Sequence, residues 1–352
     1  MENFKNGIQS LATLKKVDDY GMFQMTYLGD YGFDEFLKVG VTDTEDELTF
    51  MMKHLLKGIP VDNNSINGGA GKVPEGGCTT FVARNEKGEV VFGRNVDFAP
   101  SPSLQLFTKP NTGYASVSTA NLIYCGYNID PTKDKNAPPG SNGDTEHLPK
   151  GLNLESFATL YAPYLPKDGM NAKGVAIASV YIPQAEAPYD PSKIKMNQLT
   201  AIRLVLDKAA SVDEAINLLG QYNIFFEMGI FTQYQIADSS GRSVIVNFVD
   251  GEVKITEVSE PYQICSNFSS YNPDIRGGAC EFERYDKAKA TLESNNGILT
   301  CAQSVDLLAE IGVYQQGFDC LQWSVLYNLT TLEGVIFANR KKDNLINFSL
   351  NS

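Results

Sequence analysis

A thiol, a guanidinium and a carboxylate lie close together along this chain, at Cys78, Arg94 and Asp97. They flank the open end of a predicted β-hairpin, whose two β-prone runs are residues 79–84 and 89–95. An arginine beside a cysteine lowers the pKa of the thiol and favours the nucleophilic thiolate. These residue types at this spacing therefore predict nucleophilic attack by Cys78 on a carbonyl carbon.

The pairing of the two strands decides which side chain faces the thiol. The four turn residues read Asn-Glu-Lys-Gly, so Arg84 and Glu89 are expected to flank the turn. Cys78 then lies opposite Arg94 or Asn95. Because a slip of one residue moves every side chain to the other face of the sheet, the spacing leaves open which of the two shares the face of the thiol.

A cysteine nucleophile needs a proton acceptor, and histidine is scarce in this chain. Its two histidines are His54, in an amphipathic helical pattern, and His147, in a polar loop. Neither context predicts a catalytic base. If the bond between Gly77 and Cys78 is cut, the new α-amino group, with a pKa of about 8, can take and return the proton of its own thiol. The pair Gly76-Gly77 suits a cut because glycine accepts strained backbone geometry.

A Gly- and Asn-rich stretch at residues 61–77 is the best domain boundary. We expect residues 1–77 to be a pro-segment cleaved after Gly77, and residues 78–352 to be the catalytic domain. The clearest helix of the pro-segment, predicted for residues 44–56, opens with a capping-box pattern. This helix is expected to cover the site before cleavage. On spacing alone, a plain linker before an ordinary strand residue fits as well.

The remaining periodicity predicts helices and strands that alternate along the chain. Antiparallel strand pairs separated by helices predict sheets covered by helices. The expected helices are residues 199–209, 212–219, 285–292 and 302–311, and the expected further strands are residues 175–182, 231–237, 243–248, 324–329 and 334–338.

The composition excludes several classes of function. A net charge of −13 argues against binding to nucleic acid or anionic lipid, because both require basic patches. No stretch approaches the roughly 18 apolar residues of a membrane span. The first residues lack the apolar region of a signal peptide. The sequence as it stands therefore predicts a cytoplasmic protein, or an exported or cell-envelope protein if the natural chain starts upstream of Met1.

The cysteines and carboxylates show no metal-binding pattern. The six cysteines, at positions 78, 125, 265, 280, 301 and 320, form no CxxC pair. Apart from Cys78, we interpret them as ordinary buried thiols. The acidic run at residues 130–134 is interpreted as a solvated loop. We expect neither a metal nor a cofactor.

Six motifs of the chain resemble one family of enzymes. The sequence is similar to the N-terminal-nucleophile hydrolases of the choloylglycine hydrolase or linear amide C–N hydrolase group, which includes bile salt hydrolases, penicillin V acylases and, more distantly, acid ceramidase and N-acylethanolamine acid amidase. The motifs are Gly-Cys-Thr-Thr-Phe-Val-Ala-Arg-Asn at residues 77–85, Phe-Gly-Arg-Asn-Val-Asp-Phe at 92–98, Asp-Gly-Met-Asn-Ala-Lys-Gly-Val at 168–175, Cys-Ser-Asn-Phe at 265–268, Glu-Arg-Tyr at 283–285 and Trp-Ser-Val-Leu-Tyr at 323–327.

The resemblance implies a fold and a set of roles. The implied fold is α+β, a four-layer αββα sandwich of two antiparallel sheets covered by helices. Cys78 is the implied nucleophile and, through its amine, the base, while Arg94 steadies the thiolate and Asp97 orients the amine. The implied oxyanion hole consists of the Asn171 backbone N–H and the Asn267 side chain, and Arg284 supports the charge network. Structural roles for the last three, as a turn residue, a strand-end cap and a surface cation, stay open.

The resemblance also implies a reaction. The expected substrate is a small N-acyl amide that joins an apolar acyl group to a small polar amine, such as an N-acyl amino acid, an N-acylethanolamide or a conjugated bile acid. An acyltransferase that resolves the thioester with an amine and a dormant ligand-binding copy of the fold are the alternatives. A homo-oligomer is left open. In bile salt hydrolases the cysteine is exposed by loss of the initiator Met, whereas 77 residues precede Cys78 here.

Overall fold

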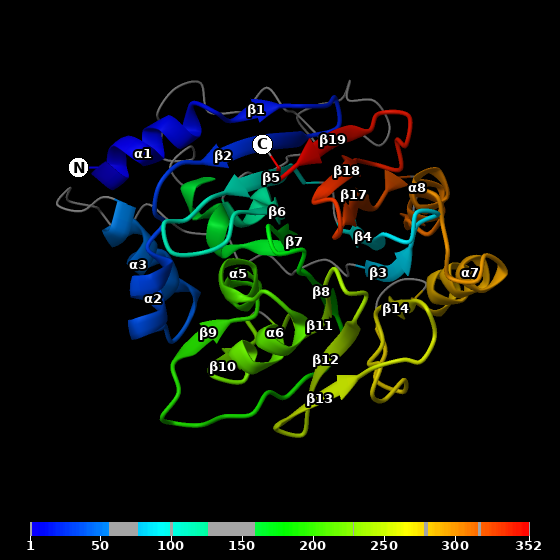
Figure 1. Cartoon of the computed structure of the whole chain (residues 1–352). Helices are drawn as coiled ribbons and strands as arrows, with labels where there is room; N and C mark the ends of the chain where they lie inside the picture. Colours follow the sequence, from blue (N-terminus) through cyan, green and yellow to red (C-terminus); the bar gives the residue numbers. More distant parts are fainter. Residues whose placement is uncertain are drawn as a thin grey trace.

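Two β-sheets packed face to face form the centre of this computed structural model (Figure 1). The structure describes residues 2–55, 77–98, 101–125, 159–227, 229–277, 281–315 and 318–351. The larger sheet has nine strands, in the order β1 (Lys15–Lys16), β2 (Met22–Tyr27), β5 (Ser103–Thr108), β6 (Ser116–Asn121), β7 (Pro166–Asn171), β8 (Ala176–Tyr181), β11 (Thr232–Ala237), β12 (Ser243–Val249) and β13 (Glu252–Thr256). The smaller sheet has six, in the order β14 (Gln263–Cys265), β3 (Gly77–Arg84), β4 (Val90–Asp97), β17 (Leu321–Asn328), β18 (Glu333–Phe337) and β19 (Ile346–Ser349).

Helices cover the outer face of each sheet. The helices α5 (Thr200–Lys208) and α6 (Val212–Leu219) pack on the nine-stranded sheet, and α7 (Glu281–Ser294) and α8 (Cys301–Glu310) pack on the six-stranded sheet. The remaining elements are α1 (Glu2–Leu11), α2 (Phe33–Val39), α3 (Thr44–Leu55), the 3₁₀ helices η2 (Leu122–Cys125) and η4 (Thr159–Tyr164), and two short strand pairs, β9 (Lys195–Asn197) with β10 (Asn223–Phe225) and β15 (Tyr314–Gln315) with β16 (Phe318–Asp319). The expected αββα sandwich is confirmed.

Buried apolar side chains fill the three spaces between the four layers. One cluster, which includes Trp323, lies between the two sheets. A second packs α5 and α6 on the nine-stranded sheet. A third, which includes Phe81, packs α7 and α8 on the six-stranded sheet. The predicted helices and strands are all present, one helix with its predicted bounds and the others with bounds shifted by one to a few residues, because apolar periodicity marks the faces that these layers bury.

The N-terminal segment is built into the fold. Strand β2 pairs with β5, and this pairing is parallel, unlike the antiparallel pairings elsewhere among the described strands of the two sheets. Phe23, Met25 and Phe36 are buried in the same core cluster as the residues of α5. The expectation that the predicted helix of residues 44–56 covers the site is wrong: α3 lies with α1 and η4 beyond the nine-stranded sheet, whereas Cys78 lies on the six-stranded sheet.

The hairpin of β3 and β4 forms as predicted, but its register differs from the expected one. Arg84 pairs with Val90, so Cys78 lies opposite Val96 rather than Arg94 or Asn95. The side chain of Asn85, the first residue of the turn, accepts hydrogen bonds from two backbone N–H groups within the turn, and Gly88 adopts a positive φ of 79°. These contacts close a longer turn than the one predicted.

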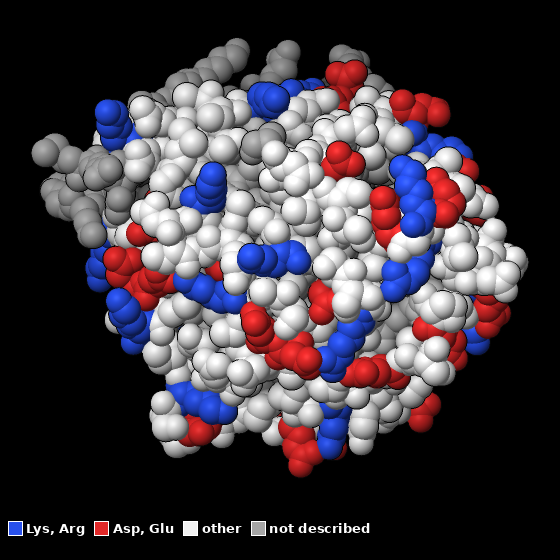
Figure 2. All heavy atoms as spheres, viewed as in Figure 1, with Lys and Arg blue, Asp and Glu red and all other residues white. Residues whose placement is uncertain are grey.

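Acidic and basic side chains are interspersed over the face of the molecule drawn in Figure 2. That face therefore carries no concentrated positive field of the kind that polyanions require. Among the residues that the structure describes, no helix is both long enough and apolar enough to cross a lipid bilayer.

Candidate active site

Cys78 lies near the start of β3, at the end of the six-stranded sheet, and its side chain is half-buried. It packs against an apolar wall of Val180, Ile245 and Cys265, which come from β8, β12 and β14. Two of these strands belong to the nine-stranded sheet. The thiol therefore faces the space between the two sheets.

Arg94 shares the face of the thiol. It pairs with Thr80, which lies two residues after Cys78 on β3, and alternate residues of a strand share a face. The side chain of Arg94 is fully buried, and its Nε lies 3.8 Å from Oδ2 of Asp168. Asn95 points the other way, where its side-chain amide donates to the backbone of α8. The question that the spacing left open is thus answered in favour of Arg94.

A continuous set of hydrogen bonds joins Asp97 to the backbone of Cys78. Arg284, on α7, donates through Nη1 to Oδ2 of Asp97 at 2.8 Å and through Nη2 to Oδ1 of Asn267 at 2.6 Å. The same Oδ1 accepts the backbone N–H of Cys78 at 2.6 Å. Cys78, Asp97 and Arg284 come from β3, β4 and α7, and Asn267 lies just after β14. Asp97 therefore reaches the Cys78 nitrogen indirectly, through Arg284 and Asn267.

The other polar groups of Asp97 and Asn267 are also held. Oδ1 of Asp97 accepts the backbone N–H of Val313 at 2.8 Å. Nδ2 of Asn267 donates to the backbone oxygen of Tyr181, at the end of β8, at 2.8 Å. An amide nitrogen carries two N–H groups, so Asn267 keeps a second donor at this position. Asn267 thereby links the two sheets at the thiol.

Gly77 lies directly beneath the guanidinium of Arg284. A Cβ atom added to Gly77 would lie 2.9 Å from Nη2 and 3.1 Å from Nη1 of Arg284. The first contact is closer than real Cβ atoms show and the second is tight, and Arg284 is held in place by its hydrogen bonds to Asp97 and Asn267. A side chain at Gly77 would therefore have to displace Arg284 from the positions that these hydrogen bonds fix.

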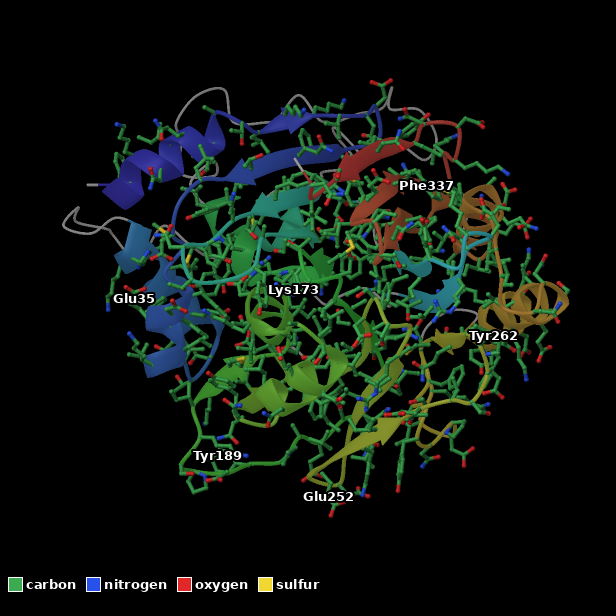
Figure 3. The ribbon with its side chains drawn as sticks, viewed as in Figure 1. Glu35, Lys173, Tyr189, Glu252, Tyr262 and Phe337 are labelled. Carbon is green, nitrogen blue, oxygen red and sulfur yellow. The ribbon has the colours of Figure 1, made fainter. Side chains whose placement is uncertain are left out.

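Asn171 is not brought to this group. Its backbone N–H donates to the carbonyl of Val175, and its side chain bonds the backbone of Leu206 and Ala209 at the end of α5. It lies at the opposite end of β8 from Tyr181, on the order of 20 Å away at ~3.3 Å per residue. Its neighbour Lys173 is labelled in Figure 3 beside α5. The expected oxyanion role of its N–H is contradicted, since that N–H closes the turn after β7.

Three residues of the site were not among the predicted ones. Asp168 opens the same motif as Asn171 but points into the space between the sheets, where Trp323 Nε1 and Tyr327 Oη donate to it at 3.0 and 2.6 Å. Their sequence signal was their membership of two of the six motifs. What the sequence could not supply was their mutual contact, because it joins positions more than 150 residues apart.

The remaining candidates lie away from Cys78 or outside the described residues. His54 belongs to α3 and stacks on Phe50 at 6.4 Å between ring centroids. His147, Cys280 and the acidic run at residues 130–134 fall outside the described residues. Within the described ranges, no three His, Cys, Asp or Glu side chains are grouped so as to hold a metal ion.

Among three similar solved structures, the first supports the fold. A mutant of the conjugated bile acid hydrolase from Clostridium perfringens aligns with a TM-score of 0.55 at 14% identity, over 78% of this chain and 92% of that chain. Penicillin V acylase from Agrobacterium tumefaciens gives 0.48 at 15% identity, over 78% and 87%. The N-acylethanolamine-hydrolyzing acid amidase ortholog from Caenorhabditis elegans gives 0.43 at 13% identity, over 72% and 93%. A comparison with curated proteins gives no match.

The sequence itself matches a family model. The model of the linear amide C–N hydrolases, choloylglycine hydrolase family, matches residues 78–276, and the match begins at the cysteine of the site. This range covers more than half of the 352 residues. The chain therefore belongs to the choloylglycine hydrolase family of linear amide C–N hydrolases, as the resemblance of its motifs indicated, and it is a hydrolase that acts on carbon–nitrogen bonds of linear amides.

Proposed function

We propose that this chain is an N-terminal-nucleophile cysteine hydrolase, which cuts its own Gly77–Cys78 bond and then cleaves small N-acyl amides through a thioester on Cys78. The observation that carries the proposal is the convergence on one residue of two sets of groups. Arg94 lies on the thiol side of Cys78, and Asn267 accepts a hydrogen bond from its backbone nitrogen at the end of a hydrogen-bonded chain that starts at Asp97 and runs through Arg284. A cysteine with charged or polar groups beside both its sulfur and its nitrogen is suited to use the sulfur as nucleophile and the nitrogen as base.

Self-cleavage would begin with attack of the Cys78 sulfur on the carbonyl carbon of Gly77. The C–N bond breaks, the nitrogen takes the proton released by the thiol, and a thioester joins Gly77 to the sulfur. Water then adds to the thioester, which leaves a carboxylate on Gly77 and a free thiol and α-amine on Cys78. Arg284 lies over Gly77, so its charge favours the oxyanion and the new carboxylate.

Turnover of substrate would use the same atoms. The α-amine accepts the proton of the thiol, and the thiolate attacks the acyl carbon of the substrate. The resulting α-ammonium gives its proton to the departing amine, and water resolves the thioester. Asn267 already accepts a hydrogen bond from the Cys78 nitrogen through Oδ1, and an acceptor at that place would also bind an N–H group of the protonated amine.

The surroundings of Cys78 favour an apolar acyl group. The wall of Val180, Ile245 and Cys265 beside the thiol carries no charge. Directly after Asn267, the half-buried ring of Phe268 stacks on Phe282 at 4.8 Å between ring centroids. Binding a hydrocarbon chain against such a surface removes apolar area from water and so lowers the free energy of the complex. We therefore propose a substrate whose acyl part is apolar and whose amine is small and polar.

Intact mass and N-terminal sequencing of active enzyme test the proposal. We expect two polypeptides, one ending at Gly77 and one beginning with Cys78, in the wild type. The Cys78→Ala variant should stay as one chain and lose hydrolysis of a panel of N-acyl amides by at least about 1,000-fold, since the nucleophile is removed. Cys301→Ala removes an exposed thiol elsewhere and serves as the control.

Two outcomes would overturn the proposal. Hydrolysis that survives Cys78→Ala would exclude the thioester, and active enzyme with residue 78 still joined to Gly77 would exclude the α-amine as base. Adding a primary amine to the assay distinguishes hydrolysis from acyl transfer. A product that carries the added amine in excess over free acid would assign the alternative, transferase activity.

A further inference from the structure

A buried carboxylate links the two sheets next to the candidate site. Asp168, on β7 of the nine-stranded sheet, accepts hydrogen bonds from Trp323 and Tyr327, both on β17 of the six-stranded sheet. All three side chains are fully buried. Two different donors thus fix both oxygens of the carboxylate, at 3.0 Å and 2.6 Å.

Arg94 lies in the middle of this arrangement. It pairs across the sheet with Val325, whose neighbours on the same face of β17 are Trp323 and Tyr327. Within the described part of the chain, Nε and Nη1 of Arg94 make no hydrogen bond, although the side chain is fully buried. A buried cation without a nearby negative charge is strongly destabilising. Asp168, 3.8 Å from Nε, supplies that negative charge.

The donors around Asp168 show which form of the carboxyl the site is built for. Burial raises the pKa of Asp168, while Arg94 and then the Tyr327 hydroxyl act in the opposite direction. Burial and the Asp168 charge together raise the pKa of Tyr327, so its hydroxyl keeps the proton that it donates. An oxygen that accepts from O–H and another that accepts from N–H fit the ionised carboxylate, which has acceptors only.

The charge of Arg94 acts on the thiol of Cys265, which lies next to Cys78. Burial raises the pKa of Cys265, which packs against Cys78, and Arg94 acts in the opposite direction on the same thiol. Cys265, on β14, pairs with Thr80, on β3. Its side chain therefore lies on the face of the sheet that Cys78 and Arg94 share. The position of the Arg94 guanidinium therefore decides how strongly a thiolate is favoured at this end of the sheet.

We propose that Asp168, clamped by Trp323 and Tyr327, is a positioning residue that holds Arg94 in place beside Cys78. The proposal rests on the proposed function, because it assigns Arg94 to the nucleophile. Asp168 acts through Arg94 and touches neither the substrate nor the sulfur. The inter-sheet core thereby contributes directly to the reactivity of the thiol.

The test measures the reactivity of Cys78 without any substrate. The rate at which iodoacetamide alkylates Cys78 is followed against pH by peptide mass spectrometry, which separates Cys78 from the other cysteines. In Asp168→Asn, which keeps the shape and removes the charge, Arg94 loses its partner and leaves the thiol. We expect alkylation at pH 7 to slow about tenfold, because the guanidinium no longer lies beside the sulfur to favour the thiolate.

A double mutant separates action through Arg94 from a direct effect. If Asp168 acts through Arg94, then Asp168→Asn combined with Arg94→Gln should be no slower than Arg94→Gln alone. Rate losses that multiply in the double mutant would overturn the proposal, and so would a wild-type rate in Asp168→Asn. Cys78→Ala tests the proposed function separately, so the two can fail independently.

A second buried pair provides the matched control. Arg203 and Asp207, on α5, are equally buried, and Nη1 of Arg203 lies 3.1 Å from Oδ1 of Asp207. Asp207→Asn should lower the melting temperature and leave the alkylation of Cys78 unchanged. Slower alkylation in that variant would show that any loss of buried charge disturbs the thiol, and would overturn the proposal.

The single tryptophan reports on the clamp. Because Trp323 is the one tryptophan of the chain, its fluorescence should change in Asp168→Asn and not in Asp207→Asn. If Asp168→Asn does not fold, Tyr327→Phe decides, since it keeps the charge and removes one of the two donors. Alkylation slowed about threefold supports the proposal, and a wild-type rate contradicts it.

Discussion

At the scale of single residues, Gly77 shows how much one missing carbon matters. The guanidinium of Arg284 occupies the space that a Cβ would need, and Asp97 and Asn267 prevent it from moving. We predict that Gly77→Ala slows self-cleavage at least tenfold, because the methyl group displaces Arg284 from both partners. The measurement is the fraction of uncut chain over time, by intact mass.

Gly220→Ala is the control for this prediction. A Cβ at Gly220, which follows α6, would meet only ordinary contacts of 3.5 Å or more. Its backbone already has a φ of −68°, which any residue adopts. Cleavage in Gly220→Ala should match the wild type. Normal cleavage in Gly77→Ala as well would show that Arg284 yields, and that the close approach has no role in processing.

At the scale of the elements, tyrosine hydroxyls tie the N-terminal segment to the catalytic layers. Tyr31, which precedes α2, donates to Oδ2 of Asp207 on α5 at 2.6 Å. We predict that Tyr31→Phe lowers the free energy of unfolding by about 1.5–3 kcal/mol, because a buried hydrogen bond to a charged group is lost. Equilibrium denaturation in urea of the uncut Cys78→Ala variant measures it.

Tyr27, at the end of β2, provides the control for the Tyr31→Phe variant. Its ring lies edge-on to Tyr31 at 5.5 Å between centroids, and its hydroxyl is buried with no hydrogen-bond partner in the described part of the chain. Tyr27→Phe should change the free energy of unfolding by less than about 0.5 kcal/mol, or stabilise the protein, since no bond is broken. Equal losses in the two variants would contradict the assignment.

The sequence predicted elements well where the signal was local. The helix of residues 212–219 keeps its predicted bounds, and its cap forms as the pattern Ser-Val-Asp-Glu indicates, with Ser211 accepting from the Glu214 N–H. The β3–β4 hairpin was also predicted, but its register was wrong. The turn is closed by contacts of the Asn85 side chain, which the four-residue pattern does not specify.

Non-local features of the site could not be predicted from single motifs. The motif at residues 168–175 was correctly singled out, yet the wrong member was assigned to the site. Asn171 ends its strand and closes a turn, while Asp168 points into the space between the sheets. The spacing of a motif gives the order of its residues along the strand. Which of these residues lies near the thiol depends on how the strand packs against the other sheet, and a single motif does not contain that information.

At the scale of the whole molecule, Glu47 connects the N-terminal segment to three other parts of the chain. Its pattern suggests a helix cap exposed to solvent, but the carboxyl is fully buried and accepts hydrogen bonds from Tyr161, Asn197 and Thr200. Burial raises its pKa to about 7 in spite of these donors. The folded protein therefore favours the protonated carboxyl more than the unfolded chain does.

The sign of the resulting pH dependence follows from this shift. Because the folded pKa is the higher one, the stabilisation is complete below the ordinary pKa and is lost as the pH rises through 7. We predict that Glu47 alone costs the protein roughly 2 kcal/mol of stability between pH 5.5 and 8.5. Melting temperatures at both pH values measure it. Glu47→Gln stays neutral and should show a smaller change, whereas parallel curves for the two proteins would contradict the prediction.

The place of β2 in the nine-stranded sheet changes what a cut after Gly77 would mean for the unfolding reaction. Before the cut, losing and regaining β2 is an event within one chain. Afterwards the same event releases a separate polypeptide, so refolding becomes a second-order reaction whose yield falls on dilution. If the bond is cut as proposed, the segment that carries Phe23 and Phe36 would be joined covalently to the rest of the sheet only before the cut, and the chain would fold as a single molecule only once.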